Sequence, residues 1–264
     1  MGHQKRHSKH IFTEQAKKAD FKMSLKRIWE IDALRGIAIV SMVIFHTVWA
    51  LNFFDVIKID LKTSSWIMFQ LFIGITFLLI VGISLTLSYA RIKNKKVNVG
   101  NKYLMRGLKL LGIAMLVTLA THIAISSGTV FFGVLHLIAV SIIISVPFLN
   151  KRITNLVLGI FAVLLGILFS TVTVSSPFLV WLGFRLLGFY TIDYYPVFPW
   201  FGIVLIGMYL GNTFYPGGER TIKIFKNKPK WSNILSWLGR HSLKIYFFHA
   251  VVIYFSIKII HLMI

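Results

Sequence analysis

Seven long apolar runs constrain this chain more than any other feature of its sequence. A bilayer core about 30 Å thick is crossed by about 20 apolar residues in an α-helix. Lipid offers the backbone no hydrogen-bond partners, so a run that crosses it must satisfy its own N–H and C=O groups. The sequence therefore predicts an all-α fold, a polytopic transmembrane helix bundle of about seven spans. The runs are 36–54, 66–90, 110–125, 130–149, 153–172, 195–214 and 243–262, the last with Lys244 and Lys258 near its ends.

Composition supports a membrane protein and excludes several kinds of site. Of the 264 residues, 56% are hydrophobic and 14% are charged, whereas soluble domains carry about 25% charged residues. The chain contains no cysteine. A disulfide framework, a thiol nucleophile and a cysteine-ligated metal are therefore excluded, and no metal is expected.

The basic residues alternate from one linker to the next. Eight lie in 1–31, seven in 91–109, two in 150–153 and six in 215–240, out of 29 in the whole chain. The intervening linkers carry very few. By the positive-inside rule, the N-terminus is cytoplasmic and the C-terminus lies outside a cell membrane that the chain crosses several times. The net charge of +21 is explained in this way without nucleic acid.

Two segments fall outside the pattern of spans. Residues 1–22 are polar and basic without apolar periodicity, and we interpret them as a disordered N-terminal extension before a transmembrane domain at 23–264. Met23 is an alternative start. The stretch 177–190 is too short to span and contains Arg185, so we interpret it as a re-entrant or interfacial segment on the outer side.

The first span carries a charged pair and a histidine. Arg35 and His46 are eleven residues apart, which is about three helical turns and about 16 Å of rise, so they share nearly one face. Asp32 also lies on that face and is expected to pair with Arg35. No Asp, Glu, Lys or Arg occurs in 36–54. A titratable residue inside such a span is a functional hypothesis, although a histidine satisfied by a neighbouring helix remains the alternative.

Further polar residues occur near the other spans. The start of span seven, LGRHSLKIYFFH at 238–249, offers Arg240 and the free N–H groups of a first helical turn to an anion. Ser242 and His249 share a face of this helix, and Tyr246 lies beside them. His136 enters span four from the outer side. Asp193 and Trp200 flank an aromatic, proline-containing entrance on the outer face, for which an interfacial aromatic belt is the alternative.

Five segments in the same order resemble the catalytic domain of heparan-α-glucosaminide N-acetyltransferase and its prokaryotic relatives. More distantly they resemble membrane O-acyltransferases that modify surface polysaccharides. The segments are IDALRGIAIVSMVIFH at 31–46, LFIGITFLLIVGISLTLS at 71–88, GVLHLIAV at 133–140, DYYPVFPWFGIVLIGMYLG at 193–211 and LGRHSLKIYFFH at 238–249.

The resemblance implies transfer of an acetyl group from cytoplasmic acetyl-CoA to an extracytoplasmic acceptor, a sugar amine or hydroxyl of a glycan. Arg35 and His46 match an Arg and a His of the polysaccharide O-acyltransferases at the same spacing. We therefore expect His46, Arg35 and His249 to be catalytic. We expect Arg240, Arg106 and Ser242 to bind the coenzyme, and Asp193, Trp200 and His136 to bind the acceptor.

One feature departs from the family, and other functions remain open. The lysosomal enzymes carry their reactive histidine in the loop after the first span, but the corresponding loop 47–65 contains no histidine. Either His46 takes this role, as in the O-acyltransferases, or this protein is not a close functional equivalent of the lysosomal enzymes. The alternative function is a small-solute transporter that uses the same His and Arg, and a structural membrane subunit is a third possibility. A homodimer is also left open.

Overall fold

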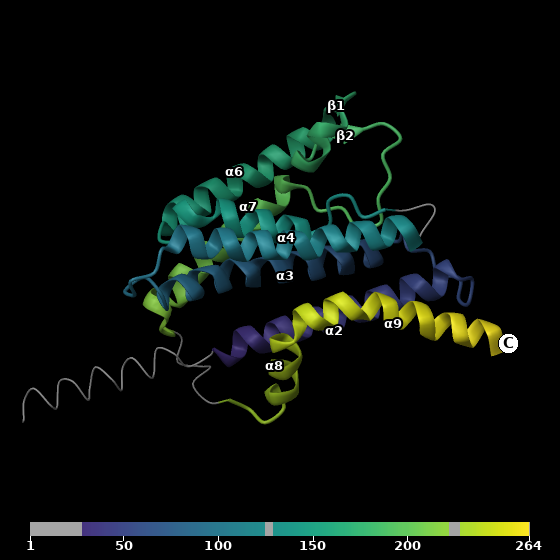
Figure 1. The fold of residues 1–264 in the computed structure, drawn as a ribbon, viewed down its shortest axis with the longest axis horizontal. Helices are drawn as coiled ribbons and strands as arrows, with labels where there is room; N and C mark the ends of the chain where they lie inside the picture. The colour runs from purple at the N-terminus through teal and green to yellow at the C-terminus, as the bar shows by residue number, and fades with distance from the viewer. Residues whose placement is uncertain (1–27, 125–128, 222–227, 264) are drawn as a thin grey trace, which may run out of the picture.

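The computed structural model describes residues 28–124, 129–221 and 228–263, and its helices run side by side in two groups (Figure 1). The predictions for residues 1–22 and for Met23 lie outside the described residues. The helices are α2 (Trp29–Phe53), α3 (Ser64–Ala90), α4 (Val99–Ala124), α5 (Val134–Ile144), α6 (Arg152–Thr171), α7 (Val197–Phe214), α8 (Ser232–Arg240) and α9 (Ser242–Met263). Short 3₁₀ turns are η1 (Val146–Phe148), η2 (Pro177–Leu182) and η3 (Pro216–Gly218).

All seven predicted runs form helices, and five of the described helices are long and apolar enough to cross a membrane. These five are α2, α3, α4, α6 and α7. The helix α5 has 11 residues, so it rises only about 16 Å and covers about half of a hydrocarbon core. The helix α9 has 22 residues, and it is apolar over Ser242–Ile257, the continuous part whose side chains the structure describes. An all-α bundle with five helices that could cross a membrane is thus confirmed, while seven full spans stay a prediction.

The segment near 177–190 folds as a small irregular cap. It contains η2 and the strand β2 (Arg185–Leu186), which pairs in parallel with β1 (Thr173–Val174). The sequence did not indicate these strands because each has only two residues. This cap marks one end of the bundle, which we call the sheet end. The other end, where α2 begins and where the linkers 91–98 and 149–151 lie, is the basic end (Figure 1).

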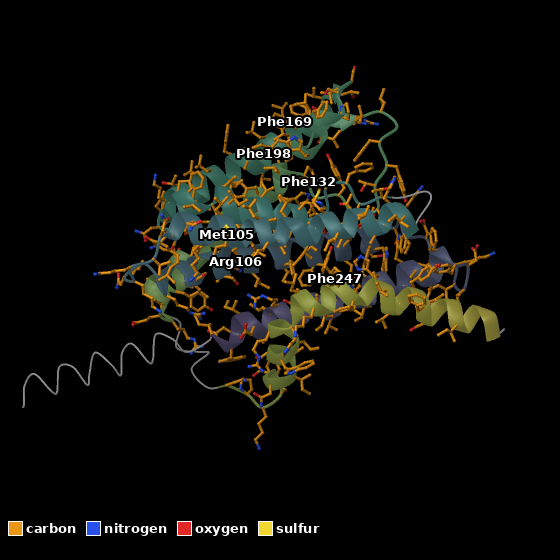
Figure 2. All side chains as sticks on the ribbon, in the orientation of Figure 1. Met105, Arg106, Phe132, Phe169, Phe198 and Phe247 are labelled. Carbon is orange, nitrogen blue, oxygen red and sulfur yellow. The ribbon has the colours of Figure 1, made fainter. Side chains whose placement is uncertain are left out.

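The larger group of helices is held by one buried cluster. The helix α7 packs between α3 and α6, while α5 packs on α4. Leu78, Leu137, Val204 and Met208 are fully buried in the cluster that joins them. The outward faces are apolar as well, as Met105 of α4 and Phe247 of α9 illustrate (Figure 2). Such an exposed apolar surface suits contact with lipid tails.

The smaller group consists of α2, α8 and α9, and its helices meet closely at the basic end. A side chain at Gly36 would collide with the backbone carbonyl of Leu235, and one at Gly239 with the carbonyl of Asp32. Nearby, buried Glu30 accepts two hydrogen bonds of 2.6 Å from Arg220, which fastens the linker after α7 to the beginning of α2.

The prediction for the start of span seven is corrected in one respect. The sequence suggested that Arg240 lies at the first turn of the helix of span seven, beside its free N–H groups. Instead, Arg240 is the last residue of α8, and His241 separates it from α9, which begins at Ser242. The His241 N–H donates to the carbonyls of Trp237 and Leu238, which closes α8. Arg240 therefore lies at a helix C-terminus, and the free N–H groups of a first turn do not surround it.

The contact of α2 with α8 leads to a stability prediction. Gly36→Ala should destabilise the protein by about 1–3 kcal/mol, because overpacking of the crossing outweighs the better helix propensity of alanine. Gly112→Ala in α4 is the matched control, since nothing lies within 4 Å of a side chain added there. Thermal unfolding in one detergent measures both variants. Equal melting temperatures for the two would contradict the close contact.

Candidate functional site

A cavity of about 260 Å³ opens at the basic end and is lined mainly by charged side chains and hydroxyl groups. Four arginines and one carboxylate contribute, so the charge of the lining is strongly positive. The lining residues are Ile28, Ile31, Asp32, Arg35, Ser84, Leu87, Ser88, Arg91, Arg106 and Arg240. Clustered guanidinium groups of this kind suit a phosphate or another multivalent anion.

The ends of four helices bring these residues together. Asp32 and Arg35 stand one turn apart at the beginning of α2. Ser84, Ser88 and Arg91 follow at intervals of four and three residues along the end of α3, so they share one face. Arg106 comes from the first turns of α4, and Arg240 ends α8.

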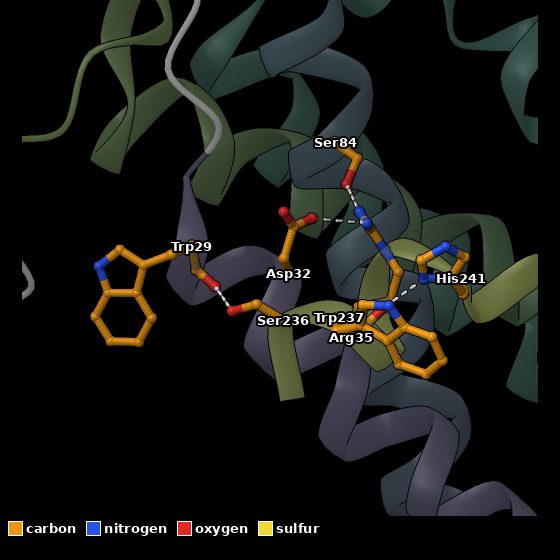
Figure 3. A network of polar contacts seen from close by, with 7 residues as sticks. All are labelled: Trp29, Asp32, Arg35, Ser84, Ser236, Trp237 and His241. Atoms are coloured by element: carbon orange, nitrogen blue, oxygen red, sulfur yellow. Dashed lines mark hydrogen bonds and ion pairs between the residues drawn. The ribbon is translucent and has the colours of Figure 1, made fainter. Parts of the chain in front are cut away.

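Arg35 is held in a defined position inside this cavity (Figure 3). One terminal nitrogen of its guanidinium lies 3.2 Å from Oδ1 of Asp32, and the other donates to the Ser84 hydroxyl at 2.6 Å. The predicted Asp32–Arg35 pair is thereby confirmed. A planar guanidinium bonded at both terminal nitrogens loses much of its rotational freedom, so it presents a preorganised charge to an anion.

His46 and His249 form an adjacent pair farther along the bundle. Their ring centroids are 4.8 Å apart. The Nδ1 atom of His46 lies 2.9 Å from the Met42 carbonyl, and that of His249 contacts the Tyr246 carbonyl. A carbonyl can only accept, so each Nδ1 carries a proton, and in a neutral imidazole the Nε2 then keeps its lone pair. The Nε2 of His249 is buried without a hydrogen-bond partner among the described residues.

Asp193 is turned into the bundle toward α5 and α9. Its Oδ2 accepts a hydrogen bond of 3.0 Å from the Val134 N–H in the first turn of α5 and one of 3.4 Å from the Tyr246 hydroxyl. Gly133 leaves the room for this carboxylate, because a side chain there would collide with Oδ2. Asp193 lies in the loop before α7, outside the membrane-spanning helices, and burial raises its pKa to about 6. Tyr246 thus connects Asp193 with the histidine pair.

The structure brings some predicted site residues together and separates others. Arg35, Arg106 and Arg240 share the cavity, but Ser242 is not among its lining residues. His136 packs between α4 and α5, where its Nε2 lies 3.2 Å from the Thr118 hydroxyl and its ring is near Phe132. Trp200 packs against Tyr195 with ring centroids 4.8 Å apart and ring planes tilted by 48°. The roles assigned to all these residues stay predictions.

Sequence reasoning did not single out Ser84, Ser88 and Arg91, although a signal for them exists. The two serines are polar residues four apart near the end of an otherwise apolar run, and Arg91 continues the same face. Polar side chains at helical spacing inside a span indicate a buried or functional face.

A scan against protein-family models matches residues 27–251 to the model described as heparan-alpha-glucosaminide N-acetyltransferase, catalytic. The match covers most of the chain and includes the cavity and both histidines. The chain belongs to this family. The family is an acetyltransferase family, which together with the apolar helices indicates a membrane acetyltransferase. Neither the curated proteins nor the solved structures that were compared gave a match.

Acetyl-CoA is the donor that suits this family in general, and the cavity suits it chemically. Its arginines and serine hydroxyls would hold the phosphates of the coenzyme. Among the residues that the structure describes, no cluster of three or more His, Asp or Glu side chains could hold a metal ion.

The bond from Val134 to Asp193 leads to a prediction on folding. Asp193→Ala should lower the free energy of unfolding by about 1 kcal/mol, because the first turn of α5 loses its side-chain acceptor. Asp193→Asn should lower the free energy of unfolding much less, since the asparagine amide oxygen can still accept the hydrogen bond from the Val134 N–H. Thermal unfolding of the two variants in the same detergent tests this, and equal losses would show that the acceptor at α5 is unimportant.

Proposed function

We propose that this protein transfers an acetyl group from acetyl-CoA, bound at the basic end, to a sugar amine or hydroxyl that enters from the sheet end. One observation carries the proposal: the arginine cavity and the histidine pair lie on the same helices. Arg35 and His46 are both on α2, and Arg240 and His249 flank the junction of α8 and α9. A base and a phosphate site are thus held at a fixed separation.

The separation suits the shape of the donor. Arg35 and His46 are eleven residues apart, which corresponds to about 16 Å along α2. Acetyl-CoA carries its phosphates at one end of a long pantetheine arm and its thioester at the other. Phosphates bound by Arg35, Arg106 and Arg240 would leave the arm free to extend between the helices toward His46 and His249.

The histidines supply the base for the chemical step. The acceptor oxygen or nitrogen attacks the thioester carbonyl carbon while the Nε2 of His46 removes its proton, and the C–S bond then breaks. The departing thiolate takes up a proton, so the products are the acetylated acceptor and CoA with a free thiol. His249 lies against His46 and provides a second lone pair for holding or moving this proton.

Asp193 and Tyr246 belong to the acceptor side of the same proposal. They connect the loop before α7 with the histidine pair. Trp200 of α7 and His136 of α5 are the other residues that we assign to the acceptor. Hydroxyl and amine groups of a sugar are donors that a buried carboxylate can orient. A sugar oriented by Asp193 would present its nucleophilic atom to His46 from the side opposite the coenzyme.

The distribution of basic residues supports a cytoplasmic basic end. Arg91, Lys93, Lys95 and Lys96 follow α3, and Lys228 and Lys230 precede α8 at the same end. The positive-inside rule then places the cavity in the compartment that contains acetyl-CoA, the N-terminus in the cytoplasm and the C-terminus outside.

Loss of His46 should nearly abolish transfer while binding persists. His46→Ala is expected to lower the rate about 10²–10⁴-fold, because a general base contributes about that much. Release of the CoA thiol can be followed with a thiol-reactive dye and glucosamine as acceptor, and the chain itself contributes no cysteine background. Equilibrium dialysis with labelled acetyl-CoA measures binding on the same preparation.

His249→Ala should also slow transfer, whereas His122→Ala is the matched control. His122 is exposed near the end of α4 and bonds to Thr129, away from the pair. Turnover of His46→Ala within a few-fold of wild type would refute the catalytic assignment.

The cavity arginines should determine affinity for the donor. Arg106→Gln and Arg240→Gln are each expected to weaken acetyl-CoA binding about tenfold, because a charge-assisted hydrogen bond contributes about 1.5–3 kcal/mol. Arg152→Gln is the control, since Arg152 lies at the same end over the Tyr209 ring and outside the cavity lining. Equal affinity of all three variants in low salt would place the coenzyme elsewhere.

A further inference from the structure

An exposed apolar stripe runs along α8. Trp231, just before the helix, and Ile234 and Trp237 within it are 63%, 70% and 52% exposed. A spacing of three residues places them on one side of a helix. The opposite side is buried against α2 through Ser232, Ser236 and Gly239. One side of this short helix therefore packs against α2, and its apolar side is exposed on the outside of the protein.

The position of α8 relates this stripe to the bilayer. The helix packs on the first two turns of α2, where the Ser236 hydroxyl donates to the Trp29 carbonyl at 3.3 Å (Figure 3). It runs across the helices of the bundle, whereas α2 and α9 run along it (Figure 1). Because α2 is long and apolar enough to span a membrane, its first turns lie near one membrane surface. A helix that crosses it there lies along that surface.

The charges around α8 indicate what covers the stripe. Lys228 and Lys230 are exposed immediately before the helix, and no Asp or Glu follows Glu219 in the sequence. Tryptophan is enriched at the membrane interface, where its ring contacts acyl chains and its N–H meets water and headgroups. Interfacial helices combine such an apolar face with lysines that attract anionic lipids.

We infer that α8 is an interfacial helix that inserts Trp231, Ile234 and Trp237 into the leaflet at the basic end, while Lys228 and Lys230 contact anionic headgroups. The inference is independent of acetyl transfer, because it rests on exposure, orientation and charge alone. A second copy of the chain or another protein segment could cover the same stripe instead of lipid, and fluorescence quenching distinguishes these arrangements.

A single cysteine can report the environment of a chosen position, because the chain has none of its own. Ile234→Cys places a fluorescent nitrobenzoxadiazole label on the apolar stripe. Asn94→Cys is the control, since Asn94 is exposed in the linker 91–98 at the same end of the bundle. Both labelled proteins are reconstituted in vesicles of phosphatidylcholine mixed with phosphatidylglycerol. Nitroxide-labelled lipid and aqueous iodide then serve as quenchers.

We expect the label at position 234 to be quenched strongly by nitroxide near the lipid headgroups and weakly by iodide. The label at position 94 should show the opposite preference. Quenching of both labels by iodide alone would overturn the inference. Protection of position 234 from both quenchers would also overturn it, because a protein segment or a second copy would then cover the stripe.

The lysines are tested on the same labelled protein. Replacing phosphatidylglycerol by phosphatidylcholine should reduce the lipid quenching at position 234, and Lys228→Gln with Lys230→Gln should remove this dependence on lipid charge. Quenching that is equal in the two lipid mixtures would overturn the assignment of the lysines to headgroups. Circular dichroism of each variant before reconstitution confirms that the helices have formed.

Discussion

Gly36 of α2 and Gly239 of α8 meet with no side chain between them, and this contact determines where Arg240 lies. Since α8 ends at Arg240, a wider separation of the two helices would remove that guanidinium from Asp32 and Arg35. The same contact orients the break at His241, from which α9 starts. The position of His249 relative to His46 therefore depends on a crossing made near the opposite end of α2.

Along α2 the protein separates two kinds of chemistry that require different surroundings. Clustered positive charge is tolerated at the basic end, where water reaches the cavity and Asp32 offsets part of the charge. The imidazoles are partly buried within the bundle, where an ionised group without a partner would be costly. Each donates its Nδ1 proton to a carbonyl of its own helix, which satisfies one ring nitrogen.

The short helix α5 makes room for polar contacts inside the bundle. Because α5 covers only about half of a hydrocarbon core, its first turn lies within the bundle and exposes the Val134 N–H to a side chain of another segment. Asp193 fills this position and also reaches Tyr246 of α9. A full-length span in place of α5 would satisfy that N–H at the membrane surface, and the connection from the loop to the histidine pair would be lost.

The sequence by itself determined that the chain forms a helical membrane bundle, because long uncharged runs have few other solutions in lipid. It also predicted the Asp32–Arg35 pair and the shared face of Arg35 and His46, since both follow from helical spacing within one segment. Only the tertiary structure decided that His249 lies against His46, that Ser84 and Arg91 join the arginine cavity, and that a break at His241 separates Arg240 from the helix α9. Those features depend on how separate helices approach one another, and glycine contacts and loop lengths set that approach without leaving a periodic signal.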